Sequence, residues 1–249
     1  MIDLTGTSIL LTGASRGIGS VTARVLDRAG ARVLVHYGAS RDAAEALASS
    51  LANDPVLLEA DLSRAGAGAA LWAAAIDAAG TVPVVVNNAG IAPYAAVEDS
   101  DEVWASTWER TLQVNLVAVA DICRAAIGHF GTIGGGSIIN VASRAAFRGD
   151  EPNMMHYAAS KGGVIALTRS IARGFGDRGV VAYAIAPGWT ATEMALDHLA
   201  ANPDEVAGYP LGEAVPPIEV ANTIAFLASG MARHLTGTTI DINGATYVR

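Results

Sequence analysis

Short runs of β-branched and apolar residues alternate along this chain with longer stretches in which apolar positions recur every three or four residues. The first pattern is typical of strands and the second of amphipathic helices. The runs predict strands at residues 8–11, 32–35, 56–59, 82–86, 136–141, 180–186 and 238–242. The stretches between them predict helices at 18–28, 41–51, 65–79, 102–130, 157–175 and 217–228.

This alternation predicts βαβ units stacked on a parallel sheet. The 82–86 run, Val-Pro-Val-Val-Val, is apolar at every position, as in strands that are covered on both faces. No linker, charge block or internal repeat divides the chain. We therefore predict an α/β fold with one Rossmann-type domain over residues 1–249, a doubly wound parallel sheet of about seven strands with helices on both faces.

Residues 189–216 show no clear periodicity and contain many turn-forming residues. Long irregular segments in compact domains often serve as lids over a binding site. We predict a substrate lid here, with an ordinary surface excursion as the alternative.

Composition narrows the classes of partner. The formal net charge of −8 argues against nucleic acid and against anionic membrane surfaces, so a small-molecule partner is favoured. The only cysteine, Cys123, lies in an apolar stretch and is interpreted as a buried structural thiol. We see no export signal and no run of 18 uninterrupted apolar residues, which favours a cytoplasmic location. The histidines are dispersed, so no metal site is predicted.

The first strand runs directly into a glycine-rich turn, Thr-Gly-Ala-Ser-Arg-Gly-Ile-Gly at residues 12–19, which opens a helix. Glycines let a phosphate approach the free backbone N–H groups of a helix N-terminus. The spacing differs from the G-x-G-x-x-G fingerprint, but the position inside the first βαβ unit is that of a dinucleotide site. We predict that this turn binds a cofactor through Gly13, Ser15, Arg16, Gly17, Ile18 and Gly19.

The end of the second strand carries no acidic residue to accept a hydrogen bond from a ribose 2′-hydroxyl. Residues 34–41 instead bring Tyr37, Ser40 and Arg41, and Arg16 stands in the glycine turn. Two guanidinium groups are suited to a 2′-phosphate. We therefore predict NADP(H) in preference to NAD(H), which stays possible. The alternative is that both arginines are solvated surface residues.

Two later turns complete the predicted cofactor site. Asp61, followed by Leu62, ends the third strand and can accept a hydrogen bond from an adenine amino group; its alternative role is a helix cap shared with Ser63. The fourth strand is followed by Asn-Asn-Ala-Gly, which offers amide and backbone groups beside the cofactor. From this turn we expect contacts by Asn88, Ala89 and Gly90.

Lys161 is the only lysine in the chain, and it lies four residues after Tyr157. On a helix this spacing puts both side chains on one face. We expect the cation, together with partial burial, to favour the phenolate and bring the pKa of Tyr157 toward neutrality, so that it acts as an acid/base. A surface lysine beside a core tyrosine is the alternative.

Ser143 follows the fifth strand at the edge of the sheet where ligands of such folds bind. Its hydroxyl can hold a substrate carbonyl. A serine at a strand end is, however, commonly a turn residue or a helix cap, and that alternative stays open.

Taken in order, these motifs resemble the short-chain dehydrogenase/reductase family over nearly the whole chain, most of all its bacterial 3-oxoacyl-acyl-carrier-protein reductases. The resemblance implies hydride exchange between a nicotinamide cofactor and a carbonyl or secondary alcohol. It also implies a homotetramer built on the helices at 102–130 and 157–175. The implied catalytic tetrad is Asn115, Ser143, Tyr157 and Lys161, and the residues implied near the carboxamide are Pro187, Gly188, Thr190 and Thr192.

The chain departs from the family pattern at the substrate side. Ser143 and Tyr157 are 14 positions apart, one more than expected, which predicts an insertion in the loop at 144–156. Because acyl-carrier protein is acidic and this chain is too, a small ketone or secondary alcohol is the preferred substrate class. A non-catalytic nucleotide-binding sensor or scaffold is the alternative function.

Overall fold

Seven parallel strands form one sheet in the order β3-β2-β1-β4-β5-β6-β7. The computed structural model describes residues 2–249, apart from the side chains of residues 194, 196–198 and 205. The strands are β1 (Ser8–Leu11), β2 (Arg32–Tyr37), β3 (Val56–Glu59), β4 (Val84–Asn87), β5 (Gly136–Val141), β6 (Val180–Pro187) and β7 (Thr239–Ile242). This sheet confirms the predicted fold class.

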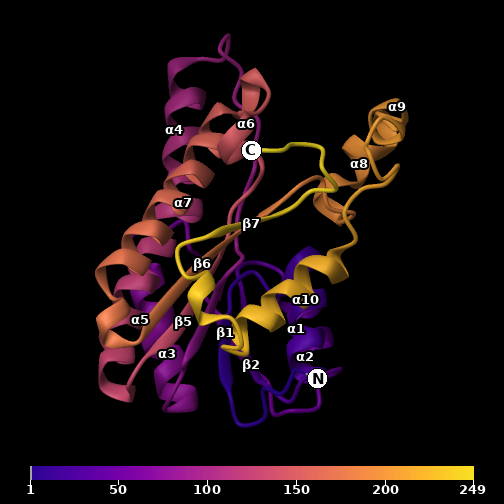
Figure 1. Ribbon diagram of the computed structural model, residues 1–249. Helices are drawn as coiled ribbons and strands as arrows, with labels where there is room; N and C mark the ends of the chain where they lie inside the picture. Colours follow the sequence, from indigo (N-terminus) through magenta and orange to yellow (C-terminus); the bar gives the residue numbers. More distant parts are fainter. Residues whose placement is uncertain (1) are drawn as a thin grey trace.

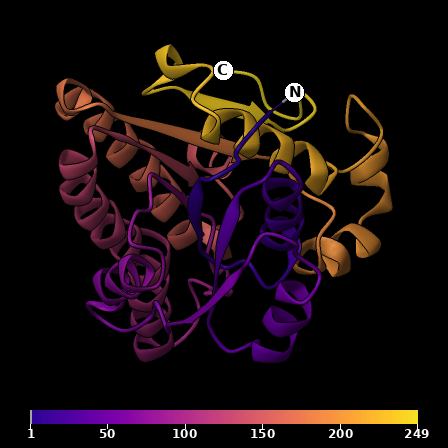
Figure 2. The ribbon, with the colours of Figure 1, turned by 90° about the horizontal axis from the view of Figure 1, so that it is seen from below.

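Helices cover both faces of the sheet (Figures 1 and 2). On one face lie α1 (Gly17–Arg28), α2 (Arg41–Ala48) and α10 (Pro217–Ala228). On the other lie α3 (Ala67–Ala79), α5 (Ala118–Ile133) and α7 (Met155–Gly174). Successive strand residues enter different cores: Ile139 packs with the first group and Ile138 with the second. Burial on both faces explains the continuous apolar run Val84, Val85 and Val86 of β4.

The predicted helix at 102–130 is longer and less regular than its pattern suggests. It consists of α4 (Asp101–Leu112), a π-helical turn η1 (Gln113–Val117) and α5. By length and hydropathy, residues 101–133 would also suit a membrane span. The side chains of Ile122 and Phe130, however, are buried against the sheet, and α5 is a core helix of the fold.

Two segments that we expected to be irregular contain short helices. Residues 189–216 hold α8 (Glu193–Ala201) and α9 (Pro203–Ala207), which project from the body near the carboxyl edge of the sheet (Figure 1). The loop at 144–156 holds α6 (Ala145–Arg148) and a 3₁₀ turn, η2 (Pro152–Met154). Further 3₁₀ turns are η3 (Gly176–Arg178) and η4 (Arg233–Leu235). Single turns of helix are too short to show a hydrophobic period.

A polar network crosses the core between the sheet and α5. Asn87 Nδ2 donates to Asn140 Oδ1 over 2.8 Å, and Asn140 Nδ2 donates to Thr168 Oγ1 over 2.9 Å. Cys123 lies beside both amides and is buried, as predicted. Burial raises the pKa of this thiol to about 12, because the thiolate loses its hydration there. Cys123 is therefore an unreactive structural residue.

The C-terminal segment packs against α6. The guanidinium carbon of Arg249 lies 4.1 Å from the ring centroid of Phe147, and the Tyr247 ring stacks on Phe147 at 6.5 Å. Arg249 also pairs with Asp241 of β7 over 2.9 Å. These contacts tie the helix that follows Ser143 to the last strand of the sheet.

Candidate active site

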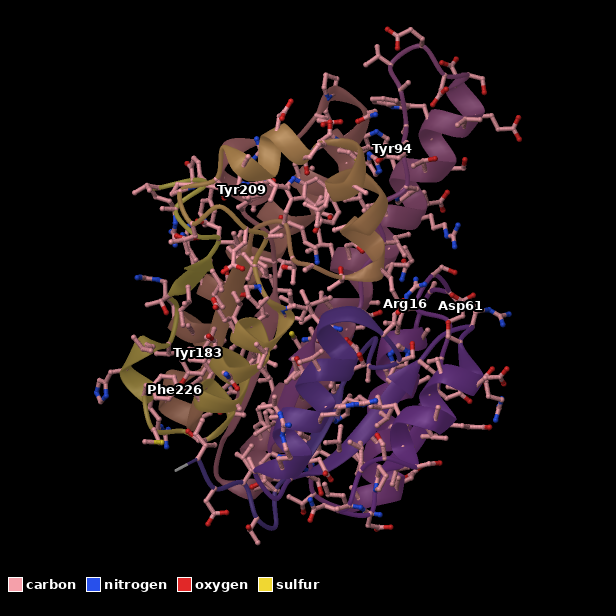
Figure 3. All side chains as sticks on the ribbon, turned by 90° about the vertical axis from the view of Figure 1, so that its right-hand side faces the viewer. Arg16, Asp61, Tyr94, Tyr183, Tyr209 and Phe226 are labelled. Atoms are coloured by element: carbon pink, nitrogen blue, oxygen red, sulfur yellow. The ribbon has the colours of Figure 1, made fainter. Side chains whose placement is uncertain are left out.

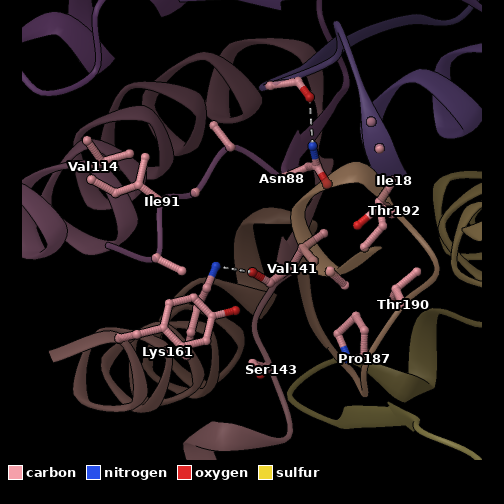
Figure 4. Close-up of a pocket in the computed structure, with 18 of the residues that line it drawn as sticks. Ile18, Asn88, Ile91, Val114, Val141, Ser143, Lys161, Pro187, Thr190 and Thr192 are labelled. Carbon is pink, nitrogen blue, oxygen red and sulfur yellow. Dashed lines mark hydrogen bonds between the residues drawn. The ribbon is translucent and has the colours of Figure 1, made fainter. Parts of the chain in front are cut away.

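The carboxyl ends of β1 and β4 meet at the point where the strand order reverses, which is where doubly wound sheets bind nucleotides. Thr12 Oγ1 accepts hydrogen bonds from the N–H groups of Asn88 and Ala89 at 2.9 and 3.0 Å. Asn88 Nδ2 donates in return to the carbonyls of Thr12 and Gly13 (Figure 4). The glycine turn and the Asn-Ala-Gly turn are thus joined into one rigid edge.

The three glycines are required for different reasons. Gly13 has φ +62°, and a Cβ there would lie 2.8 Å from Ala89 Cα. Gly17 also has a positive φ and begins α1. At Gly19 a Cβ would lie 2.1 Å from the Gly13 carbonyl oxygen, so the helix could not pack on the turn. No side chain caps the start of α1, and its first N–H groups remain available to an anion.

His36, which sequence reasoning missed, fastens this turn to the next two strands. Its Nδ1 accepts from the Gly13 N–H at 3.0 Å, and its Nε2 lies 3.1 Å from the Ala60 carbonyl oxygen. Burial lowers the pKa of His36, so the ring is neutral at pH 7 and carries its proton on Nε2. A polar residue in an otherwise apolar strand was the available signal.

At one end of the cavity lie Arg16, Ser40 and Asp61, of which Figure 3 labels Arg16 and Asp61. Asp61 accepts hydrogen bonds from the backbone N–H and hydroxyl of Ser63 and so stabilises the turn after β3. It does not cap a helix, because α3 begins only at Ala67, after Gly66. The same hydrogen bonds lower the pKa of Asp61.

Two predicted cofactor residues lie apart from the cavity lining. Tyr37 donates from its hydroxyl to Glu59, and Arg41 forms an ion pair with the same carboxylate. Arg41 also pairs with Glu45 over 3.6 Å and lies above the Tyr37 ring. The predicted pair of guanidinium groups is therefore reduced to one, Arg16, because Glu59 on the neighbouring strand holds the other.

Ser143 and Lys161 lie on the opposite side of the cavity (Figure 4), and Tyr157 lines the cavity with them. The Ser143 hydroxyl lowers the pKa of Tyr157 in part, which places the two side chains near each other. Ser143 Oγ also accepts from the Ala145 N–H at the start of α6, so its capping role and its contact with Tyr157 coexist. Lys161 Nζ donates to the Val141 carbonyl over 2.9 Å and lies 5.7 Å from the Tyr157 ring centroid.

The expected shift of the tyrosine pKa is wrong for this structure. Burial raises the pKa of Tyr157 to about 12, because removal from water disfavours the charged phenolate; the Ser143 hydrogen bond lowers it in part, and the Asp150 charge raises it. Burial also lowers the pKa of Lys161 to about 8. Partial burial was expected to help the phenolate, whereas it stabilises the neutral phenol.

Asn115 occupies the π-helical turn and does not line the cavity. Its Oδ1 accepts from the Ile91 N–H at 2.8 Å, and its Nδ2 donates to the Ile91 carbonyl at 2.9 Å. A Cβ on Gly90 would lie 3.4 Å from both Asn115 Oδ1 and Lys161 Nζ. Asn115 therefore fixes the segment after β4 close to the lysine.

The end of β6 forms the remaining wall. Gly188 N–H donates to the Ile242 carbonyl over 2.9 Å, and Thr190 Oγ1 donates to the Gly188 carbonyl over 3.1 Å. The Thr192 side chain lies 3.5 Å from the position of a Cβ on Gly17, so this segment touches the glycine turn.

Together these walls enclose a cavity of about 970 Å³, large enough for a dinucleotide and a small substrate. Most of the predicted site residues line it: Gly13, Ser15, Arg16, Gly17, Ile18, Gly19, Ser40, Asp61, Leu62, Asn88, Ala89, Gly90, Ser143, Tyr157, Lys161, Pro187, Gly188, Thr190 and Thr192.

We predict that Lys161→Met makes the protein without cofactor more stable at pH 7. The pKa of Lys161 is about 8 in the fold against 10.5 ordinarily, so the folded state binds this proton less tightly than the unfolded state. The protonated Lys161 therefore destabilises the folded state. This destabilisation has its full size below pH 8 and disappears as the pH rises toward 10.5. Urea midpoints at pH 7.0 and 9.5 should show a gain that narrows with pH.

Arg169→Met removes an exposed cation from the same helix and should shift neither midpoint appreciably. A Lys161→Met variant that is less stable than the wild type at pH 7 would contradict this account.

Comparisons with known proteins agree with this geometry. A family model described as enoyl-(acyl carrier protein) reductase matches residues 13–245. The 3-oxoacyl-[acyl-carrier-protein] reductase FabG of Staphylococcus aureus is 34% identical over 246 residues, covering 97% of this chain and 98% of the relative.

Two solved structures share the fold over nearly the full length. A short chain dehydrogenase/reductase family protein superposes with a TM-score of 0.88 at 33% identity, covering 98% of this chain and 99% of that one. A putative NAD(P)-dependent gluconate 5-dehydrogenase from Beutenbergia cavernae, with NADP bound at low occupancy, has a TM-score of 0.87 at 32% identity, covering 98% and 97%. With this likeness in sequence, fold and site, the chain belongs to the short-chain dehydrogenase/reductase family, oxidoreductases that act on CH–OH groups with a nicotinamide cofactor.

Proposed function

We propose that this protein is an NADP(H)-dependent oxidoreductase that interconverts a small ketone and a secondary alcohol. The observation that carries the proposal is that Ser143, Tyr157 and Lys161 line the same cavity as the glycine turn, with Lys161 Nζ 5.7 Å from the Tyr157 ring centroid. The relatives' substrates differ from one another, so the names of those proteins do not select one for this chain.

The residues of the cavity fit a nicotinamide dinucleotide. The uncapped start of α1 suits the diphosphate, and Gly13 and Gly19 leave room beside it. When bound, the cofactor supplies or accepts hydride. Lys161 Nζ is placed to reach ribose hydroxyls, since the ammonium has two donors besides the one given to Val141. The wall formed by Pro187, Gly188 and Thr190 is available to the carboxamide.

In carbonyl reduction, Ser143 donates a hydrogen bond to the substrate oxygen and polarises the carbonyl. Tyr157 then donates its hydroxyl proton to the oxygen as charge develops there. A half-buried phenol with a pKa of about 12 holds this proton at neutral pH, which favours the role of proton donor. In the reverse direction the phenolate accepts the alcohol proton. The positive charge of Lys161 is available to stabilise that phenolate once the substrate has displaced water.

The proposed preference for NADP(H) is supported by Arg16, which is exposed at the cavity wall and has the Ser40 hydroxyl on the same wall. β2 ends in Tyr37, and the following residues 38–40 bring no carboxylate to a ribose 2′-hydroxyl. A guanidinium group suits a 2′-phosphate through paired, charge-assisted hydrogen bonds.

We also propose that residues 189–216 form a substrate lid. Both ends of the segment are fastened: the Ala191 N–H donates to the Val215 carbonyl over 3.0 Å, and the Val215 N–H donates to the Trp189 carbonyl over 2.8 Å. Between them α8 and α9 project outward, while Thr192 and Ala195 line the cavity. A helical segment hinged at two fixed points can close over a substrate as one body.

Tyr157→Phe is predicted to lower kcat for ketone reduction by about 10²–10⁴-fold, because the proton donor is lost. The dissociation constant for NADPH, measured by fluorescence, should change by less than about threefold, because the phenol ring remains. Tyr183→Phe removes a hydroxyl from the buried face of β6 and serves as the matched control with near wild-type kcat. Equal loss of binding and turnover would show that Tyr157 is structural. A wild type that binds NADPH but reduces no ketone would support the sensor alternative.

Arg16→Leu is predicted to raise the KM for NADPH by about 10–100-fold, because charge-assisted hydrogen bonds to the 2′-phosphate contribute about 1.5–3 kcal/mol. The KM for NADH, which has no 2′-phosphate, should rise by less than about threefold. Arg41→Leu is the control, since Glu59 already neutralises that cation; it should leave the NADPH/NADH ratio nearly unchanged. A wild type that prefers NADH would overturn the proposed preference, and an equal effect of the two variants would restore the role of both arginines.

We propose a homotetramer that uses the outer faces of α4, α5 and α7. Exposed apolar side chains on or beside these helices support it: Val103 on α4, Val117 at the end of η1 and Met155 at the start of α7 are 46%, 43% and 39% exposed. Size-exclusion chromatography with light scattering should give four times the 25.4 kDa subunit mass. A monomer at micromolar concentration would refute the assembly.

A further inference from the structure

The loop between α6 and α7 brings a charged pair into the substrate side of the cavity. Arg148 ends α6, Asp150 follows two residues later, and both line the cavity with Ser143 and Tyr157. Gly149 between them has φ +80° and ψ −178°, a conformation that is essentially restricted to glycine. This glycine reverses the chain after α6 and turns Asp150 back toward the cavity.

The Asp150 carboxylate is largely buried but only partly satisfied. Its side chain is 14% exposed, and its nearest cation, Arg148, lies 3.8 Å away, beyond hydrogen-bond distance. Oδ1 accepts from the Glu151 N–H over 3.1 Å. Among the side chains that the structure describes, none donates a hydrogen bond to Oδ2. A carboxylate oxygen without a protein donor, on a cavity wall, is available to a ligand.

Asp150 also lies close enough to Tyr157 to act on the reacting phenol. Its negative charge is one of the causes that raise the pKa of Tyr157. Asp150 and Tyr157 line the same cavity, so a substrate that reaches Tyr157 is within the same space as the Asp150 carboxylate. A carboxylate accepts hydrogen bonds, and the neighbouring guanidinium donates them.

A hydroxyl group satisfies both members of this pair, because it donates to Asp150 and accepts from Arg148. A carboxylate or phosphate on the substrate would be repelled by Asp150. An ammonium would gain little, since Arg148 balances the charge. A hydrocarbon chain would cover the carboxylate without replacing its lost water, which is costly.

We propose that the substrate carries a further hydroxyl group near its reacting carbon, as hydroxyketones and polyols do, and that Asp150 and Arg148 select it. The inference rests on the proposed oxidoreductase function. Asp150 is here a specificity-determining residue: it binds the neighbouring hydroxyl and takes no part in the proton transfer to the carbonyl oxygen.

The test compares kcat/KM with NADPH for matched ketones: 2-hydroxycyclohexanone and 4-hydroxycyclohexanone against cyclohexanone, and hydroxyacetone against acetone. The wild type should favour at least one hydroxylated ketone over its parent by tenfold or more. Asp150→Asn should reduce that ratio to below about threefold. Glu151→Gln removes a neighbouring charge from the same loop and should leave the ratio unchanged.

A second readout separates binding from a general change in the loop. Because the Asp150 charge raises the pKa of Tyr157, Asp150→Asn should move the pH profile of alcohol oxidation toward lower pH. An unchanged profile would show that Asp150 lies too far from the reacting oxygen. If Asp150→Asn does not fold, inhibition of the wild type tests the hydroxyl preference instead. The inhibition constant of cyclohexane-1,2-diol should be at least tenfold lower than that of cyclohexanol.

Equal activity of the wild type on every hydroxylated ketone and its parent would overturn the inference, as would a hydroxyl preference that survives in Asp150→Asn. In both cases turnover is present, and the proposed oxidoreductase function stands. No reduction of any of these ketones, with NADPH binding intact, would instead count against the proposed function and against this inference with it.

Discussion

The contact between the turns that follow β1 and β4 determines the geometry of the whole site. Asn88 donates two hydrogen bonds to Thr12 across the point where the strand order reverses, and Gly13 approaches Ala89 too closely for any side chain. Because this edge is fixed, α1 starts with its N–H groups facing the cavity. The segment after Asn88 is then held near Lys161 by Asn115. The proposed cofactor cradle and the proposed proton-transfer groups are therefore held together by one set of hydrogen bonds and close contacts.

Burial gives the same cavity its chemical character. Desolvation shifts the pKa of Tyr157 upward and that of Lys161 downward, so both shifts favour the uncharged forms. The charged state of either residue must be supported by a partner, such as a ligand or a neighbouring side chain. At neutral pH the protein thus accepts an energetic cost at Lys161, whose protonated form is disfavoured in the fold, as functional sites commonly do.

The fold was largely predictable because its signal is local. Continuous apolar runs mark strands buried on both faces, and all seven predicted strands form. The partners of individual side chains were harder to predict from the sequence. Arg41 forms an ion pair with Glu59 because of the register of β2 and β3, and spacing along the chain does not reveal that register. His36 and Asp150 were missed for the same reason, since their roles arise from contacts with Gly13 and Arg148. The role of Asn115 came from the family resemblance alone.

The π-helical turn at residues 113–117 has a geometric consequence for the α4–α5 arm. A π turn contains about one residue more than the α-helical turn it replaces, and one residue in a helix corresponds to a rotation of about 100°. If this extra residue were lost, α4 would swing around the common axis relative to α5. Trp108, now 5.9 Å from the ring of His156 on α7, would then leave that helix. The arm therefore tolerates exchange of side chains more readily than a change in its length.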